Sequence, residues 1–298
     1  MKQSVVLVTG ATSGIGRHAA LALARSGHRV IAAGRREAAL ASLVEEAKNI
    51  PGARLEPLVL DVTSAASIDA ARDEIDRRTA GHGVDVLVNN AGIPVFGPIE
   101  LVSDGDLRRQ FDTNVFGLMA VTRAFVPRMR DRRRGRIVNV GSMGGKVTFP
   151  LGGAYHASKY AVEALSDALR MELAPFGVQV ALIEPGPIKT EFFERTMDSV
   201  AQIGQGSCYD PVLARADVIR DQTEKTAVGP EPVVRAIVHA VEARRARARY
   251  VAPFRIHFIL ALFALLPTRI TDALLGAALG LSRAADGAPR AQTSGGAA

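Results

Sequence analysis

Short runs of Val, Ile and Leu alternate with longer helical stretches along most of the chain. The apolar runs predict strands at residues 5–9, 30–33, 55–60, 84–88, 136–140 and 178–183, and the stretches between them predict helices at 15–26, 36–49, 64–78, 104–130 and 155–176. Strands that are apolar throughout and separated by helices are typical of a parallel sheet covered on both faces. The predicted fold class is therefore α/β, a single doubly wound parallel sheet with helices on both faces.

A glycine-rich turn lies between the first predicted strand and the first helix. It contains Gly10, Thr12, Ser13, Gly14, Ile15 and Gly16 in a Gly-x-x-x-Gly-x-Gly pattern. Glycines let the backbone approach a pyrophosphate, and the following helix N-terminus stabilises the negative charge. In this strand–turn–helix context the pattern predicts a dinucleotide-binding loop, so the expected sheet is of the Rossmann type.

Tyr155 and Lys159 are four residues apart on a predicted helix and so lie on one face. A unit charge about 4 Å from the phenol, at an effective dielectric constant of about 20, supplies about 4 kcal/mol. That energy would lower the pKa of the phenol from about 10 to about 7, where it can give and take a proton. The spacing also occurs by chance on surface helices, so it indicates catalysis only together with other motifs. His156 points about 100° away from this face and is interpreted as structural.

With these motifs the chain resembles the short-chain dehydrogenase/reductase family over about residues 4–190, and more loosely its hydroxysteroid and retinol dehydrogenase branch. The resemblance implies that Asp61 and Val62 meet the adenine ring. Asn89, Ala91 and Gly92, in Asn-Asn-Ala-Gly, would steady the sheet and line the cofactor. A last group would flank the nicotinamide and contact its carboxamide: Pro185, Gly186, Ile188 and Thr190.

The same resemblance implies a catalytic tetrad of Asn114, Ser142, Tyr155 and Lys159. Tyr155 would be the acid and base, and Ser142 would hydrogen-bond the reacting oxygen. Lys159 would lower the Tyr155 pKa and bond the nicotinamide ribose. Asn114 would hold a water that links Lys159 to solvent. The hydride chemistry would belong to the cofactor, whereas the protein would supply position and electrostatics.

The residues after the second strand indicate which cofactor is preferred. An acidic residue there would bond the ribose hydroxyl of NAD, but the sequence is Ala33-Gly34-Arg35-Arg36. Arg35 and Arg36 can hold a 2′-phosphate through bidentate contacts, which predicts NADP(H). Arg17 could add charge. The alternative is that these are ordinary surface arginines at the start of a helix.

Residues 1–253 contain no linker and no internal repeat, so we expect one dinucleotide-binding and catalytic domain with a substrate lid at 187–232. The lid and the loops near the reacting centre carry an apolar set: Val95, Phe96, Val147, Phe149, Leu151, Phe192, Phe193, Met197, Val200, Ile203 and Tyr209. These residues favour an apolar alcohol or ketone as substrate, with simple loop packing as the alternative.

An apolar helical extension is predicted at residues 254–281. Residues 258–266 are apolar on every side, and after Pro267 a second helix carries apolar residues on one face. The run is shorter than the roughly 20 residues that cross a bilayer. A pocket wall or subunit contact is the first interpretation, and a peripheral membrane contact beside the basic runs is the second. The Gly/Ala/Ser-rich tail at 282–298 is expected to be disordered.

The formal net charge is +7, and the basic residues lie mainly in two runs, at 128–136 and 244–249. Each run ends a helical stretch just before an apolar strand. Cations are stabilised at helix C-termini, so solvated helix ends are the favoured interpretation. An anionic membrane surface is second. Nucleic acid is third, and we expect no nucleic-acid partner.

Cys208 is the only cysteine, so no internal disulfide can form and a reducing compartment is expected. The six histidines show no metal-ligand spacing, so no metal site is predicted. An apolar strand begins soon after Met1, which leaves no room for a signal peptide. We therefore expect a cytoplasmic homo-oligomer, with possible membrane contact through residues 255–281.

Together these features predict an oxidoreductase that transfers a hydride between NADP(H) and an apolar alcohol or ketone, such as a steroid, retinoid or lipid. A reductase of 3-oxoacyl thioesters is one alternative. A non-enzymatic cofactor-sensing protein is another, although a pure binding module would not need the acid Tyr155.

Overall fold

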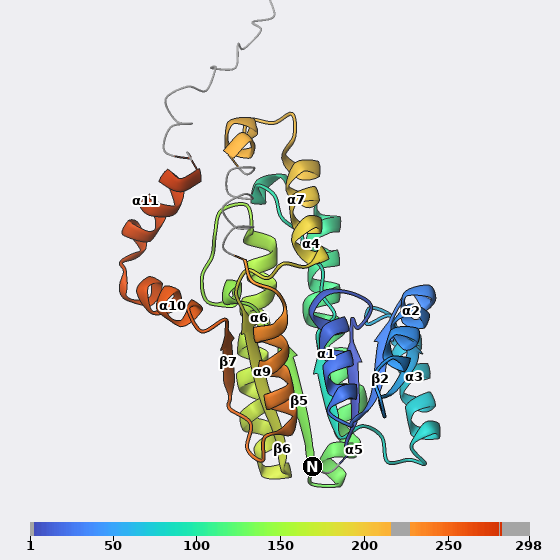
Figure 1. Cartoon of the computed structure of the whole chain (residues 1–298). Coiled ribbons are helices and arrows are strands. Elements are labelled where there is room, and N and C mark those ends of the chain that lie inside the picture. Colours follow the sequence, from blue (N-terminus) through green and yellow to red (C-terminus); the bar gives the residue numbers. More distant parts are fainter. Residues whose placement is uncertain (1–2, 216–226, 280, 282–298) are drawn as a thin grey trace, which may run out of the picture.

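The computed structural model of the protein describes residues 3–215, 227–279 and 281. Within them, a seven-stranded parallel sheet has the strand order β3-β2-β1-β4-β5-β6-β7 (Figure 1). The strands are β1 (Val5–Thr9), β2 (Arg29–Gly34), β3 (Arg54–Val59), β4 (Val86–Asn89), β5 (Gly135–Val140), β6 (Val178–Pro185) and β7 (Arg249–Ala252). The doubly wound α/β fold predicted from the sequence is confirmed, and β7 extends it at one edge.

Helices cover both faces of the sheet, as Figure 1 shows. One face carries α1 (Gly14–Arg25), α2 (Glu37–Lys48) and α9 (Glu231–Glu242). The other carries α3 (Ala65–Arg78), α5 (Leu118–Asp131) and α6 (Gly153–Leu173). Leu7 and Val8 are adjacent in β1, point to opposite faces and are both fully buried, which explains why the strands are apolar throughout.

The strand order reverses between β1 and β4, so a crevice opens at the carboxyl ends of these two strands. The lid begins after β6 with α7 (Glu191–Gly204). Its base is closed by Lys189, whose backbone N–H donates to the Val228 carbonyl oxygen at 2.9 Å. The last two residues of the segment predicted as a lid, 231 and 232, belong to α9, which packs on the sheet.

The helix predicted at 104–130 is interrupted. It consists of α4 (Asp104–Phe111), a π-helical turn (Asp112–Gly117) and α5. Gly117 in the π turn lies so close to the loop after β3 that a Cβ would sit 2.8 Å from the Val62 carbonyl oxygen. Ser64 caps α3 as predicted and accepts a hydrogen bond from the Ser67 N–H at 3.2 Å.

The two basic runs lie at helix ends before β5 and β7, but not all of their arginines are solvated. Arg136 is buried, and its guanidinium donates to the carbonyl oxygens of Ala240 at 2.6 Å and Ala243 at 2.7 Å, at the end of α9. Burial lowers the pKa of Arg136. Arg249 forms ion pairs with Glu163, Asp167 and Glu184. The expectation of solvated helix ends is therefore wrong for these two arginines, which hold the fold together.

The chain continues after β7 into α10 (Ile256–Leu265) and α11 (Thr268–Leu279), so the predicted extension is helical. No described helix is both long and apolar enough to cross a membrane. The predicted disordered tail at 282–298 lies outside the described residues.

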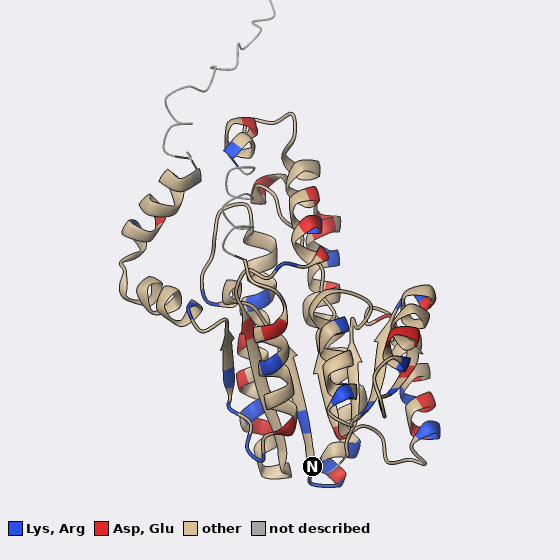
Figure 2. Cartoon of the chain, viewed as in Figure 1, with Lys and Arg blue, Asp and Glu red and all other residues tan. Residues whose placement is uncertain are grey.

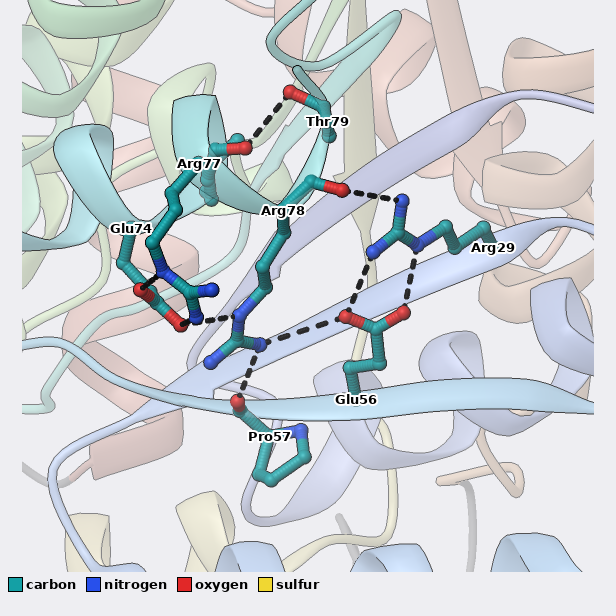
Figure 3. Close-up of polar contacts among 8 residues, drawn as sticks. Arg29, Glu56, Pro57, Glu74, Arg77, Arg78 and Thr79 are labelled. Atoms are coloured by element: carbon teal, nitrogen blue, oxygen red, sulfur yellow. Dashed lines mark hydrogen bonds and ion pairs between the residues drawn. The ribbon is translucent and has the colours of Figure 1, made fainter. Parts of the chain in front are cut away.

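A charged network joins the outer strands β2 and β3 to α3 (Figure 3). Arg29 of β2 donates from Nε to Glu56 Oε1 at 2.6 Å and from Nη2 to Oε2 at 3.1 Å, so the ion pair is bidentate. Arg29 also donates to the Arg78 carbonyl oxygen, and Arg78 donates to the Pro57 carbonyl oxygen. The hydrogen bond from Arg29 is the main reason that the pKa of Glu56 lies below its ordinary value of 4.5.

We expect Glu56→Gln to lower the free energy of unfolding by about 0.5–1 kcal/mol at pH 7, because a partly exposed ion pair loses its charge. The folded-state pKa of Glu56 lies below the unfolded one, so the pair stabilises the fold above about pH 5, and this contribution is lost as the pH falls through the folded-state pKa. Urea unfolding at several pH values measures the difference between the two proteins. A difference that stays constant or grows toward acid pH would contradict this assignment.

Candidate active site

The turn between β1 and α1 lies at the crevice and approaches its neighbours too closely for side chains. Gly10 has a φ of +63°, in the left-handed region, and a Cβ there would lie 2.8 Å from Ala91 Cα. A Cβ on Gly16 would lie 2.4 Å from the Gly10 carbonyl oxygen. Glycine at both positions therefore lets the backbone form a concave cradle.

The N-terminus of α1 opens into this cradle and is suited to an anion. Ser13 is the N-cap residue, but its hydroxyl makes no capping hydrogen bond, and the first turn of α1 holds no acidic residue. Backbone N–H groups and the helix dipole at such a terminus stabilise a phosphate. Cradle and terminus together fit the pyrophosphate of a dinucleotide.

A cavity of about 760 Å³ extends from the cradle across the carboxyl ends of the strands. The residues predicted to hold a cofactor that line it are Gly10, Thr12, Ser13, Gly14, Ile15, Arg35, Arg36, Asp61, Val62, Ala91, Gly92, Pro185, Gly186, Ile188 and Thr190. Ser142, Tyr155 and Lys159 line the same cavity. Residues from seven separate stretches of sequence thus meet in one space.

Two of the residues predicted to hold the dinucleotide, Gly16 and Asn89, do not line this cavity. The Asn89 amide is buried and donates to Thr122 Oγ1 at 2.9 Å and Asn139 Oδ1 at 3.0 Å, so it links β4 to its neighbours. Its neighbour Asn90 does line the cavity and holds the cradle, donating from Nδ2 to the Gly10 carbonyl oxygen at 3.1 Å. Side chains alternate between faces along a strand, which is why adjacent asparagines have different tasks.

The two arginines after β2 lie at one end of the cavity. Arg35 and Arg36 are exposed and form no ion pair with a described carboxylate. Burial tends to raise the pKa of the nearby Asp61, but hydrogen bonds from Thr63 and the charge of Arg35 outweigh it and lower that pKa. Arg17, expected to add charge here, instead pairs with Glu46 of α2 and does not line the cavity.

Ser142, Tyr155 and Lys159 come together at the middle of the cavity. Ser142 follows β5, and its hydroxyl accepts a hydrogen bond from the Gly144 N–H at 3.0 Å. Tyr155 lies in the first turn of α6 and is hydrogen-bonded to Ser142. The Lys159 ammonium lies 5.7 Å from the centre of the Tyr155 ring and donates to the Val140 carbonyl oxygen at 2.9 Å. A hydroxyl, a phenol and an ammonium are thus available to one reacting oxygen.

The pKa of Tyr155 is not lowered in the protein alone. Burial raises the pKa of the phenol to about 12, although the hydrogen bond with Ser142 opposes this. Burial also lowers the pKa of Lys159 to about 8, and Glu163 partly offsets that shift. The expectation of a phenol pKa near 7 is wrong here because it counted the charge of Lys159 and ignored the desolvation of both groups.

Asn114 lies in the π turn and does not line the cavity. Its Oδ1 accepts from the Ile93 N–H at 2.9 Å, and its Nδ2 donates to Ser158 Oγ at 3.1 Å. The side chain therefore holds the loop after β4 against α6. The proton relay through Asn114 stays a prediction.

His156, interpreted from the sequence as structural, also lines the cavity. Its Nδ1 lies 3.0 Å from the Gly144 carbonyl oxygen, and its ring centre lies 5.7 Å from that of Tyr155. Burial lowers the pKa of His156. The ring therefore supports the loop after Ser142 and forms part of the wall, which the helical angle alone did not reveal.

The far end of the cavity is apolar. It is lined by Phe96, Met143, Phe149, Leu151, Phe192, Phe193, Met197 and Val200, and by Ile259, Phe263, Leu275 and Ala278 of α10 and α11. Phe96 and Phe192 flank Tyr155, with ring centres 5.1 and 5.6 Å from it. Val95, Val147, Ile203 and Tyr209, also predicted near the substrate, do not line it. The apolar extension thus forms a pocket wall, one of the possibilities that the sequence left open.

Helix α7 is fastened to the loop after β4. Ser199 of α7 donates from Oγ to the Phe96 carbonyl oxygen and accepts from the Phe96 N–H, both at 2.9 Å. The aromatic wall beside Tyr155 therefore depends on the position of α7.

Curated proteins resemble the chain over most of its length. A family model described as short chain dehydrogenase matches residues 4–200. The uncharacterized oxidoreductase YbbO of Escherichia coli is 35% identical over 92% of this chain and 94% of its own length. The 3-ketodihydrosphingosine reductase of Bacteroides thetaiotaomicron is 34% identical, over 86% and 87%. Mouse retinol dehydrogenase 7 is 35% identical, over 92% and 88%. Human 17-beta-hydroxysteroid dehydrogenase type 1 is 36% identical, over 84% and 77%.

Solved structures agree with this result. A short-chain dehydrogenase from Streptomyces avermitilis superposes with a TM-score of 0.74 and 34% identity, covering 95% of this chain and 98% of its own. A variant of actinorhodin polyketide ketoreductase with NADPH has a TM-score of 0.72 and 31% identity, over 84% and 95%. A short-chain dehydrogenase/reductase from Burkholderia phymatum with NAD has a TM-score of 0.75 and 27% identity, over 92% and 95%.

The match to the family model covers well over half of the chain, and the relatives include a retinol and a hydroxysteroid dehydrogenase, so the resemblance found in the sequence is confirmed. The chain belongs to the short-chain dehydrogenase family and is an oxidoreductase that acts on CH–OH groups.

Proposed function

We propose that this oxidoreductase uses NADP(H) and interconverts a lipid-like alcohol and its ketone. The observation that carries the proposal is the single cavity that connects Arg35 and Arg36, through Ser142, Tyr155 and Lys159, to an aromatic and aliphatic end. A charged cofactor end and an apolar substrate end thus meet at a phenol, where the reaction needs a proton.

Each polar group around Tyr155 has a separate role in the proposed reaction. A nicotinamide cofactor held in the cradle would supply the hydride for the carbonyl carbon in the reducing direction. The Tyr155 hydroxyl gives its proton to the carbonyl oxygen, and the Ser142 hydroxyl donates a hydrogen bond to that oxygen as its charge develops. The Lys159 ammonium stabilises the resulting phenolate, which offsets the burial that otherwise disfavours it.

The preference for NADP(H) rests on charge. Arg35 and Arg36 line the cavity and form no close ion pair with a described carboxylate, although the charge of Arg35 acts on the nearby Asp61. Strand β2 ends in Gly34, which has no side chain to bond a ribose hydroxyl. Guanidinium groups bind phosphate oxygens in a bidentate manner. The family neighbours bind either cofactor, and one was solved with NADPH and another with NAD. The arginine pair therefore supports NADP(H).

The substrate class rests on the wall of the cavity and on the relatives. The wall around the far end is aromatic and aliphatic, and the relatives include a 3-ketodihydrosphingosine reductase and a retinol dehydrogenase. Both names denote apolar compounds that carry an oxidisable alcohol or reducible ketone. A reductase of 3-oxoacyl thioesters is the alternative function, and the similarity to a polyketide ketoreductase supports that alternative. The cytoplasmic location and homo-oligomeric state expected from the sequence also remain part of this proposal.

Removal of the phenolic hydroxyl in Tyr155→Phe should reduce turnover by about 10²- to 10⁴-fold, the usual contribution of a general acid or base. The ring should still pack between Phe96 and Phe192, so NADPH affinity should be largely kept. Single-turnover rates and NADPH titration separate the two effects. Turnover near that of the unaltered enzyme, in a folded variant, would remove Tyr155 from the reaction.

The arginine pair should make NADPH bind at least about tenfold more tightly than NADH, a gap of about 1.4 kcal/mol. In Arg35→Gln/Arg36→Gln this ratio should fall toward one, with NADH affinity little changed. Gly34 is less suitable for substitution, because a Cβ there would lie 2.6 Å from Thr12 Cγ2. Arg17→Gln is the matched control, since Arg17 lies near the cradle but pairs with Glu46. An unaltered protein that binds NADH as tightly as NADPH would overturn the assignment.

A substrate panel with NADPH tests the apolar end of the cavity. We expect the highest kcat/KM among long-chain, steroid and retinoid ketones or aldehydes, and lower values for short polar ketones. A clear preference for 3-oxoacyl thioesters would favour the alternative. The absence of turnover with every compound, together with tight NADPH binding, would favour a cofactor-sensing protein.

A further inference from the structure

Helices α10 and α11 expose apolar side chains on the side away from the cavity. They lie beside the sheet, beyond β7, at the end of the molecule where the lid also lies (Figure 1). Leu265 is 83% exposed and Phe258 is 68% exposed. With Phe254, Leu262, Ile270 and Leu274, which are also exposed, these residues form what we call the apolar face. An apolar patch of this kind on a globular protein marks an interaction site.

The same two helices have a second side, which lines the catalytic cavity. Phe263 lines the cavity, and its ring centre lies 6.0 Å from that of Phe149. Ile259, Leu275 and Ala278 line it as well. The wall between the cavity and the apolar face is therefore only one helix thick.

A cationic groove of about 380 Å³ lies next to the apolar face, between α9, β7 and the start of α10. Its lining includes Arg235, Arg247, Arg249, His239, His257 and Phe254, and no carboxylate from the described part of the chain. Phe254 joins the groove to the apolar face, since its ring meets that of Phe258 edge-on with centres 5.7 Å apart.

Two of the groove arginines are available to an external anion. Arg249 is committed to Glu163, Asp167 and Glu184. Arg235 and Arg247 are exposed and have no ion pair with a described residue. The basic run at 244–249 ends at Arg249, the first residue of β7, and α10 follows β7. Arg247 is the exposed member of this run that lines the groove. Figure 2 shows that α10 and α11 themselves carry few charges.

Charge decides between the two surfaces that could cover the apolar face. A contact between two copies across a two-fold axis pairs different residues of the same patch, and the one acidic residue of α10 and α11 is Asp272, so it would offer Arg235 and Arg247 together little opposite charge. A bilayer with anionic headgroups offers both partners, acyl chains for the apolar face and negative charge for the groove. Helix α10 has 10 residues and is about 15 Å long, about half of the hydrocarbon thickness, which suits a helix lying at the interface.

We propose that α10 and α11, together with the groove at Arg235 and Arg247, dock on an anionic bilayer surface, and that the cavity takes its substrate from that bilayer. Docking itself does not depend on the reaction. Only the entry of the substrate from the bilayer rests on the proposed function. In this arrangement an apolar substrate passes between α10–α11 and the lid without crossing water.

The test of docking is co-sedimentation of the full chain with vesicles of phosphatidylcholine alone and of an equal mixture with phosphatidylglycerol. We expect binding to the anionic vesicles that weakens as salt is raised, because exposed charges are screened. Phe258→Ser/Leu265→Ser alters the apolar face, and Arg235→Glu/Arg247→Glu alters the groove. Neither pair includes a cavity-lining residue, and each variant should bind anionic vesicles about tenfold or more weakly.

The matched control is Arg130→Glu/Arg134→Glu, which changes the net charge by the same amount. These two exposed arginines lie at the end of α5 and just before β5, and neither lines the groove. The control should bind vesicles like the unaltered protein. NADPH affinity and thermal unfolding should be the same in all four proteins, which excludes misfolding as the cause.

Substrate entry is tested separately, with one ketone dissolved in water and one long-chain ketone held in the vesicles. Activity on the dissolved ketone should be unchanged in the face and groove variants, whereas activity on the vesicle-held ketone should fall with vesicle binding. If the face and groove variants lose vesicle binding as expected but no protein reduces either ketone, docking is supported and the proposed function is wrong.

Three outcomes would overturn docking. In the first, the unaltered protein sediments no more with anionic vesicles than without vesicles. In the second, the control pair loses vesicle binding as strongly as the groove pair. In the third, Phe258→Ser/Leu265→Ser converts a stable oligomer to monomers, as measured by light scattering, while no protein binds vesicles. That result would make a second copy of the chain the occupant of the apolar face.

Discussion

The site depends on how closely the turn after β1 approaches the end of β4. Thr9 Oγ1 accepts hydrogen bonds from the N–H groups of Asn90 at 3.0 Å and Ala91 at 3.1 Å, and the Asn90 amide donates back to the carbonyl oxygens of Thr9 and Gly10. These bonds cross the point where the strand order reverses. They hold the cradle rigid, leave no space for a Cβ at Gly10, and direct the N-terminus of α1 into the cavity.

Around Tyr155, desolvation and charge oppose each other. The Tyr155 phenol and the Lys159 ammonium are both buried. Burial raises the pKa of the phenol and lowers the pKa of the ammonium, so it favours the neutral form of each group. Glu163, one turn beyond Lys159, favours the charged ammonium and is itself held by Lys146 and Arg249. Ion pairs behind α6 therefore keep a cation available next to the phenol. The phenol can then lose its proton only when that cation, and the charges brought by a bound cofactor, outweigh the burial.

Features that depend on neighbouring residues along the chain could be predicted from the sequence. Features that depend on tertiary contacts could not. The strands follow from their apolar runs, the Ser64 cap from the hydrogen-bonding capacity of its hydroxyl, and the glycine turn from the conformational freedom of the glycine backbone. The π turn at Asn114 could not be predicted, because it depends on contacts with Ile93 and Ser158. Which of Asn89 and Asn90 meets the cavity depends on the face on which β4 ends. The sequence suggests that Arg136 and Arg249 are surface charges, because their partners in α9 and α6 are distant in the sequence.

Helices α10 and α11 have apolar side chains both on the side that lines the cavity and on the side that is exposed. A pocket wall for an apolar substrate must be dry on its inner side, and an exposed apolar wall is stable only when its outer side is also covered. A polar outer side would satisfy the second condition, but α10 carries apolar side chains around most of its circumference. The substrate end of the cavity is thus completed by whatever surface covers Phe258 and Leu265. The shape and chemistry of the pocket are then properties of the protein together with that surface.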